Sequence, residues 1–217
     1  MIRLLLDHRT SPLKILCLGS HCDDIEIGCG GTLLKLIEDL RGRVIVHWVV
    51  FSSTPDREAE ARQSAEAFLK RAKSKIVIIR DFADSFFPYN GGEIKKYMHQ
   101  LSRDVSPDLI FTHYAKDLHQ DHRLISELTW NAFRDHCILE YEIPKYDGDL
   151  GSPNVFVPLK ESICRDKMTH IFRYFKSQRR RSWFTKETFL SLQRLRGVEC
   201  NASSGYAEAF YCRKIVL

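Results

Sequence analysis

Short apolar runs alternate with amphipathic stretches along most of this 217-residue chain, and this alternation restricts its fold more than any other feature. The run Val44–Phe51 is almost entirely apolar, which is typical of a strand covered by helices on both faces. The stretch Thr32–Leu40 instead repeats leucine and isoleucine at helical spacing. Strands and helices that alternate in this way build parallel sheets with right-handed crossovers. We therefore predict an α/β fold: a single-domain three-layer sandwich over residues 1–217 with a mostly parallel, Rossmann-like sheet.

The same periodicities place the individual elements. The predicted strands are Leu13–Gly19, Val44–Phe51, Lys75–Ile79, Asp108–Thr112, Val155–Val157 and Ala207–Lys214. The predicted helices are Thr32–Leu40, Pro55–Lys73, Gly92–Arg103, Asp121–Phe133, 160–177 and 186–195. Apart from its short strand, the segment 140–158 is expected to be loop. In sheets of this kind ligands bind beyond the carboxyl ends of the strands, so the loops at 19–31, 51–56, 80–90 and 112–123 are the expected location of chemistry.

Composition excludes several classes of protein. The seven cysteines are an odd number and contain no C-x-x-C pair, which argues against a disulfide scaffold and a zinc finger. The first ten residues, MIRLLLDHRT, hold too short an apolar run for a signal peptide. No stretch approaches the roughly 18 apolar residues of a membrane span. We therefore expect a cytoplasmic protein without a membrane span.

Positive charge is concentrated in the segment 176–196, which carries seven Lys or Arg residues and one Glu. Its net charge of +6 exceeds the +5 of the whole chain, so the remainder is close to neutral. With Trp183 and Phe184, the segment could contact nucleic acid or anionic lipid. It could equally be a solvated helix face, or a rim that attracts an anionic small molecule. Because the rest of the chain is not basic, we expect no nucleic-acid partner.

Two of the expected loops are rich in residue types that bind metals. His21-Cys22-Asp23-Asp24 follows the first strand, and His119-Gln120-Asp121-His122 follows the fourth. Neutral imidazole and carboxylate are the ligands of catalytic zinc sites, which keep a fourth position for water. His21 and Asp24 are three residues apart, as are His119 and His122, so the members of each pair can face one point. The sequence therefore predicts a site of two histidines and one carboxylate, suited to Zn²⁺, Fe²⁺ or another divalent ion.

The glycine-rich run Gly28-Cys29-Gly30-Gly31 suggests a nucleotide-binding loop at first sight. It lacks the G-x-G-x-x-G spacing, and the acidic residues just before it would repel a pyrophosphate. We interpret these glycines as allowing close packing of the first helix behind the site.

Taken together, these motifs resemble a known family. HCDDIEIGCGGTL is similar to the signature of the PIG-L / LmbE-like N-deacetylases, which carry H-P-D-D followed by an acidic residue and a G-C-G-G-T run. His119-Gln120-Asp121-His122 matches their second signature, H-x-D-H. Supporting matches, which extend the resemblance over residues 13–212, are Arg57-x-x-Glu60, Lys176-Ser177-Gln178 and Tyr206-Ala207-Glu208-Ala209-Phe210. The resemblance implies a zinc-dependent N-deacetylase whose Zn²⁺ is ligated by His21, Asp24 and His122. It also implies that Asp23 is the general base and that His119, oriented by Asp121, polarises the amide carbonyl.

The chain departs from that family at three places. Cys22 stands where proline is usual, and Ile25 where an acidic residue is common. The segment Phe51–Pro55 lacks the Gly-Glu-x-Gly-x-Arg-Gly run of the mycothiol- and bacillithiol-pathway deacetylases. The absence of this run argues against those substrates but leaves the expected reaction unchanged. The resemblance implies an N-acetylated amino sugar or sugar conjugate as the substrate. If the basic segment 176–196 rims the site, its net charge of +6 would favour a substrate that carries negative charge.

The chemistry of amide hydrolysis is consistent with these assignments. Zn²⁺ lowers the pKa of its bound water towards ~7 and acts as a Lewis acid on the carbonyl oxygen. The side chain of Asp23 diverges from that of its neighbour Asp24 and is better placed to take a proton from water. As an imidazolium, His119 would donate to the developing oxyanion. We expect Arg57, Asp84 and His113 to contact the substrate, with Asp117 and His113 as alternative supports of the ligands.

Two other functions remain open from the sequence. Two histidines and one carboxylate also form the facial triad of non-haem Fe(II) oxygenases, although those sites usually use H-x-D/E and commonly lie in β-barrels. A non-enzymatic nucleic-acid-binding or scaffold protein would use the basic segment 176–196.

Overall fold

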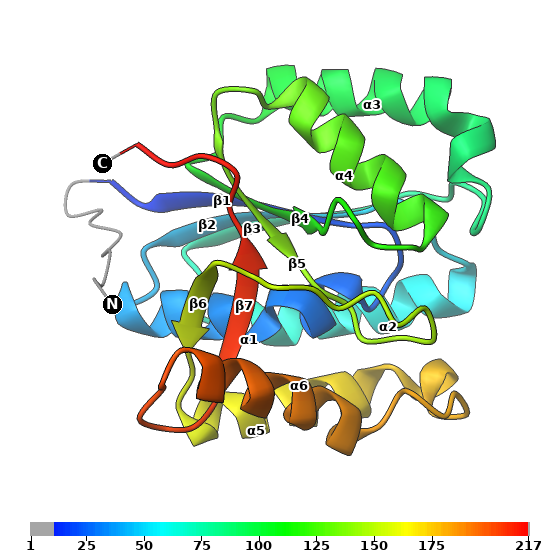
Figure 1. Ribbon diagram of the computed structural model, residues 1–217. Coiled ribbons are helices and arrows are strands. Elements are labelled where there is room, and N and C mark those ends of the chain that lie inside the picture. The colour runs from blue at the N-terminus through cyan, green and yellow to red at the C-terminus, as the bar shows by residue number, and fades with distance from the viewer. Residues whose placement is uncertain (1–10, 217) are drawn as a thin grey trace.

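A seven-stranded sheet organises residues 11–216, which the computed structural model describes (Figure 1). The strands are β1 (Leu13–Gly19), β2 (Val44–Val50), β3 (Ser74–Ile79), β4 (Leu109–His113), β5 (Cys137–Tyr141), β6 (Val155–Pro158) and β7 (Ala207–Tyr211). Their order in the sheet is β3-β2-β1-β4-β5-β7-β6. The first five strands pair in parallel, whereas β7 runs antiparallel to both β5 and β6. The predicted mostly parallel sheet is confirmed.

Helices cover both faces of this sheet, which confirms the three-layer arrangement. They are α1 (Asp24–Asp39), α2 (Pro55–Phe68), α3 (Gly91–Asp104), α4 (Gln120–Ala132), α5 (Glu161–Tyr174) and α6 (Lys186–Glu199), with short 3₁₀ turns η1 (Phe87–Asn90) and η2 (Lys176–Gln178). In Figure 1, α3 and α4 lie above the sheet, and the other four lie below it. Alternate residues of β1 serve the two layers: Ile15 and Cys17 belong to one core cluster, and Leu16 belongs to the other.

Helix α1 begins at Asp24, eight residues before the predicted start at Thr32. Three glycines lie inside this helix. Because glycine is a poor helix former, they hid the start of the helix in the sequence. A Cβ on Gly28 would lie 2.2 Å from the ring of Tyr141, and one on Gly30 would lie 2.7 Å from Phe68. The interpretation that these glycines permit close packing of the first helix is confirmed.

Strand β5 lies partly in the segment predicted as loop and was missed. Its residue Glu140 is charged yet buried, since it accepts hydrogen bonds from the indole of Trp130 and the backbone N–H of Ala115. Strands of this sheet were predicted from runs of apolar residues, and a carboxylate in a strand of only five residues interrupts such a run. Helix α2 ends at Phe68 rather than Lys73, and β7 ends at Tyr211 rather than Lys214. Gly42 lies in the turn after the first helix and has a φ of +77°, which glycine adopts without strain.

The order of the strands determines where ligands can bind. The chain proceeds outward from β1 to β2 and β3, then returns to place β4 on the other side of β1. The loops after β1 and β4 therefore diverge beyond one edge of the sheet, at the switch point where open α/β sheets bind ligands. Between residues 11 and 216, no helix combines the length and apolar character needed to cross a membrane. The ten N-terminal residues considered above as a signal peptide lie outside the described part.

Candidate metal centre and active site

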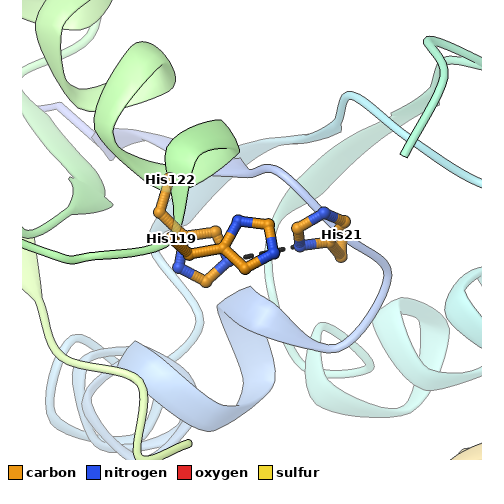
Figure 2. A group of neighbouring side chains, drawn as sticks. All are labelled: His21, His119 and His122. Carbon is orange, nitrogen blue, oxygen red and sulfur yellow. Dashed lines mark hydrogen bonds between the residues drawn. The ribbon is translucent and has the colours of Figure 1, made fainter. Parts of the chain in front are cut away.

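Two nitrogen atoms and one oxygen atom from the two loops come together beyond β1 and β4. The Nδ1 atom of His21 lies 3.2 Å from Nε2 of His122 and 3.4 Å from Oδ2 of Asp24. The same carboxylate oxygen is 3.5 Å from Nε2 of His122. His21 belongs to the loop after β1, Asp24 opens α1, and His122 lies in the first turn of α4. Figure 2 shows the rings of His21 and His122 turned toward each other, with His119 beside them.

The spacing of these atoms fits a small divalent cation. Ligand atoms held about 2.0–2.1 Å from a tetrahedral ion lie roughly 3.3 Å apart, which matches the three distances. Two imidazoles and one carboxylate are also a donor set that zinc accepts while leaving a position for water. All three side chains are buried. The predicted pairs of metal-binding residues therefore converge, although the sequences that carry them are 101 residues apart.

The outer nitrogen of His21 faces two further carboxylates. Its Nε2 lies 3.2 Å from Oδ2 of Asp121 and 3.2 Å from Oδ1 of Asp84. Burial lowers the pKa of His21, but three neighbouring carboxylates raise it well above its usual value. The hydrogen bond to His21 is the main cause that holds the pKa of Asp84 below its usual range. The two carboxylates keep a proton on Nε2, so the proton on Nδ1 is the one that a bound metal would displace.

The second histidine, His122, is held in the opposite orientation. Its Nδ1 lies 2.9 Å from Oδ2 of Asp117, so its Nε2 faces Asp24. Burial and His113 lower the pKa of His122 to about 3, which favours the neutral imidazole that a metal requires. Asp117 was one of the supports expected from the sequence. Its own partner Lys145 was not expected, because the loop 142–154 contains no recognisable motif.

His113 is fully buried and does not line the mouth of the site, contrary to the expectation that it contacts substrate. Its ring stacks on that of His122 with centroids 3.9 Å apart, and its Nε2 accepts a hydrogen bond of 2.9 Å from the backbone N–H of Ser20. The reason is its position at the end of β4, a central strand covered on both faces. His113 supports the loop after β1 from beneath.

Asp23 lies beside the donor triangle and pairs with Arg57. The guanidinium Nη2 is 3.0 Å from Oδ1 of Asp23, and Nη1 is 3.9 Å from Asp84. Burial raises the pKa of Asp23 even though Arg57 opposes that rise. Arg57 lies at the start of α2, so it reaches the site from the loop after β2. Of the residues expected to contact substrate, Arg57 and Asp84 lie at the mouth, and Asp84 has 52% of its side chain exposed.

The structure differs from the expectation that the carboxylate of Asp121 orients His119. The carboxylate of Asp121 does not orient the His119 imidazole; it accepts N–H bonds of 2.7 Å from Ser85 and 3.1 Å from Phe87 and faces His21. Only the backbone N–H of Asp121 reaches His119, at Nδ1, where His119 caps α4. A neutral His119 that accepts at Nδ1 carries its proton on Nε2. Burial and His21 lower the pKa of His119, which disfavours the imidazolium expected from the sequence.

Cys22, the residue in place of proline, packs away from the triangle. Its thiol donates to the carbonyl of Ser52, and burial raises its pKa to about 12, so it stays protonated. With its Sγ on the Ser52 carbonyl, Cys22 belongs to none of the clusters of possible metal ligands among the described residues.

The basic segment lies at the same edge of the sheet as the site. Ser177 donates from its backbone N–H and hydroxyl to Glu60 of α2, and Ser182 bonds to Tyr146 in the loop after β5. The exposed basic side chains around these anchors are Lys176, which precedes Ser177, and Arg179, Arg180 and Arg181, which lie between the two serines. Phe184 is buried, and Trp183 packs edge-on against it, so these rings do not form the exposed surface that stacking on bases requires.

Comparison with known proteins identifies the family. The sequence model of the PIG-L family, described as GlcNAc-PI de-N-acetylase, matches residues 16–133. This range contains both loops of the candidate metal site. The chain belongs to the PIG-L family. The PIG-L match ends before the basic segment and before the loop that carries Lys145.

One curated protein and several solved structures are similar to this chain. An "uncharacterized deacetylase YaiS" from Escherichia coli K12 is 26% identical over 176 residues, which cover 78% of this chain and 95% of that protein. The N,N'-diacetylchitobiose deacetylase from Pyrococcus horikoshii has a similar structure, with a TM-score of 0.71, 22% identity, and coverage of 92% of this chain and 83% of that one. GalB, a 4-carboxy-2-hydroxymuconate hydratase from Pseudomonas putida KT2440, has a TM-score of 0.71, 17% identity, and coverage of 94% and 98%. Because this fold occurs in a deacetylase and in a hydratase, the reaction must be argued from the site.

Proposed function

We propose that this protein is a metal-dependent hydrolase that removes the acetyl group from the amide nitrogen of an N-acetylated amino sugar or sugar conjugate. The observation that carries the proposal is the triangle of His21, Asp24 and His122 atoms, 3.2–3.5 Å apart, beside the carboxylate of Asp23. Membership of a de-N-acetylase family supports the reaction class. Zn²⁺ is the ion that best suits this donor set.

Amide hydrolysis needs a strong nucleophile and stabilisation of the charge that develops on the carbonyl oxygen. A zinc ion held by the triangle would lower the pKa of a coordinated water and polarise the carbonyl. Asp23 accepts the water proton as the oxygen–carbon bond forms. Arg57 engages Oδ1 of Asp23, so we assign the proton transfer to Oδ2. The raised pKa of Asp23 makes it a stronger base than an exposed aspartate.

His119 stabilises the oxyanion as a neutral donor in this proposal. Its Nδ1 accepts the backbone N–H of Asp121, so the Nε2–H is available to the carbonyl oxygen. Asp23 then returns its proton to the departing nitrogen as the carbon–nitrogen bond breaks. The products are acetate and a free amine, and no serine or cysteine nucleophile is involved.

The mouth of the site suits a sugar that carries negative charge. Arg57 and Asp84 offer a hydrogen-bond donor and an acceptor of the kind that sugar hydroxyls need. Lys176 and the three arginines at 179–181 lie at the same edge, where their field would raise the encounter rate with an anionic substrate.

Acetate release tests this function directly. The purified protein, stripped of metal and reloaded with Zn²⁺, is incubated with N-acetylglucosamine and with its nucleotide-linked form at low and high salt. We expect acetate only from the zinc-loaded protein, with a higher kcat/KM for the charged substrate that falls as salt rises. The Asp24→Ala variant is expected to lose the metal and the activity. Oxygen uptake by the Fe²⁺-loaded protein without acetate release would instead favour the oxygenase alternative.

A further inference from the structure

A buried lysine contacts the support of the metal centre from a loop that sequence motifs did not mark. Lys145 lies between β5 and β6, and its side chain is only 8% exposed. Its ammonium Nζ lies 3.0 Å from Oδ2 of Asp117 and 2.5 Å from Oδ2 of Asp149. A third carboxylate, that of Asp147, is 3.7 Å away and more exposed. Lys145 therefore holds two buried carboxylates on one positive charge.

One of these carboxylates also orients a proposed ligand. The Oδ2 atom of Asp117 that contacts Lys145 is the atom that lies 2.9 Å from Nδ1 of His122. The other oxygen of Asp117 accepts the backbone N–H of His119 at 2.8 Å. A short chain of contacts thus runs from Lys145 through Asp117 to the ring whose Nε2 faces Asp24.

The second carboxylate fixes the neighbouring backbone. Oδ2 of Asp149 accepts the N–H of Leu118 at 2.7 Å, which ties the loop after β5 to the loop that carries Asp117. Asp117 and Asp149 are brought close together by their shared contact with Lys145. Without the ammonium, two buried negative charges would face each other, and like charges at this distance repel strongly in a poorly solvated site.

We propose that Lys145 is a positioning residue of the metal centre, which keeps Asp117 on His122 by neutralising the repulsion between Asp117 and Asp149. This role rests on the proposed metal-dependent function. It places part of the control of metal affinity in the loop 142–154, outside the motifs that carry the ligands. Partners of ligating histidines in the outer shell typically change metal affinity about 10- to 100-fold when they are removed.

Zinc affinity, measured on the full chain by competition with a chelator, tests this role. Lys145→Met is expected to weaken zinc binding by about 10-fold or more. The double variant Lys145→Met/Asp149→Asn also removes the negative charge that would repel Asp117. The amide oxygen at position 149 can still accept the backbone N–H of Leu118, so most of the zinc affinity should return. Lys160→Met, which removes an exposed lysine paired with Glu38, is the matched control and should bind zinc as the wild type does.

Each outcome has a separate meaning. Wild-type zinc affinity in Lys145→Met would overturn the positioning role while leaving the proposed function intact. A double variant that binds zinc no better than Lys145→Met would show that the lysine acts through loop packing alone, and would also overturn the role. A wild-type chain that fails to bind zinc would overturn the metal centre itself.

Discussion

The buried pair Lys167–Glu208 provides the most direct test of how α1 is held in place. The two side chains are 2% and 4% exposed, and Nζ of Lys167 lies 2.7 Å from Oε1 of Glu208. Glu208 also accepts the backbone N–H groups of Gly31 and Thr32, at 2.8 and 2.6 Å, and Lys167 donates to the carbonyl of Ile27 at 2.6 Å. The pair therefore joins α5 and β7 to the middle of α1, the helix that begins at the proposed ligand Asp24.

Replacing Glu208 with Gln should destabilise the protein severely. The amide offers one acceptor oxygen for contacts now shared between two carboxylate oxygens, and its NH₂ group must face at least one donor. The ammonium of Lys167 is left in the interior without a counter-charge. Removing one partner of a buried ion pair typically costs about 3–5 kcal/mol. With a denaturant dependence of roughly 2 kcal/mol per molar urea, the unfolding midpoint should fall by about 1.5–2.5 M.

Urea unfolding followed by fluorescence measures this loss. A double variant, Lys167→Met/Glu208→Met, should be more stable than Glu208→Gln, because buried pairs are replaced by apolar side chains at little net cost whereas a lone buried charge is not tolerated. The exposed pair Lys160–Glu38 is the control, and its loss should leave the unfolding midpoint close to that of the wild type. The reasoning would be refuted by a Glu208→Gln midpoint within 0.5 M of the wild type (about 1 kcal/mol), or by a double variant no more stable than Glu208→Gln.

Three further substitutions separate catalysis from structure. Asp23→Asn should retain zinc by elemental analysis but lose hydrolysis by about 10²–10⁴-fold, as expected for a general base; loss of the metal would instead identify Asp23 as a ligand. His119→Ala should also retain zinc, and should lower kcat by about 10²–10³-fold because an oxyanion donor is removed; unchanged kcat would exclude that role. Gly28→Ala should lower the free energy of unfolding by about 1–3 kcal/mol in a thermal melt, because the new Cβ would lie 2.2 Å from the ring of Tyr141. The control Gly92→Ala places its Cβ where nothing lies within 4 Å and should not destabilise the protein. Equal stability of the two variants would contradict the packing argument.

Much of the fold was predictable because its signal is local. Strand β1 has the predicted bounds, since every residue from Leu13 to Gly19 except Lys14 is buried and the run reads as continuously apolar. The start of α1 was not predictable in this way. Gly28, Gly30 and Gly31 weaken the helical signal, and their reason for being glycine is contact with Tyr141, Phe68 and Leu159, which are distant in the sequence. Strand β5 escaped detection for a similar reason, because Glu140 finds its partners on other elements.

The residues of the candidate site were also largely predictable, but their contacts were not. His21, Asp24 and His122 are brought together because β1 and β4 are neighbours in the sheet, as the parallel-sheet pattern implies. Spacing alone could not show which nitrogen of each histidine faces the centre. That choice depends on Asp117 and on the pair Asp84 and Asp121, which hold the opposite nitrogens.

The orientation of Asp121 shows why such contacts need the folded chain. Ser85 adopts a φ of +66°, an unfavourable value for a residue with a side chain, and its backbone N–H donates to Asp121 at 2.7 Å. Phe87 adds a second N–H, so the carboxylate is drawn toward the loop after β3 and away from His119. The same turn places Asp84 against His21. The loop after β3 thus supplies no ligand to the triangle, yet it determines which nitrogen of His21 is available to a metal. A sequence motif can therefore identify the ligands of such a site while the residues that select the ligand atoms lie in segments without any motif.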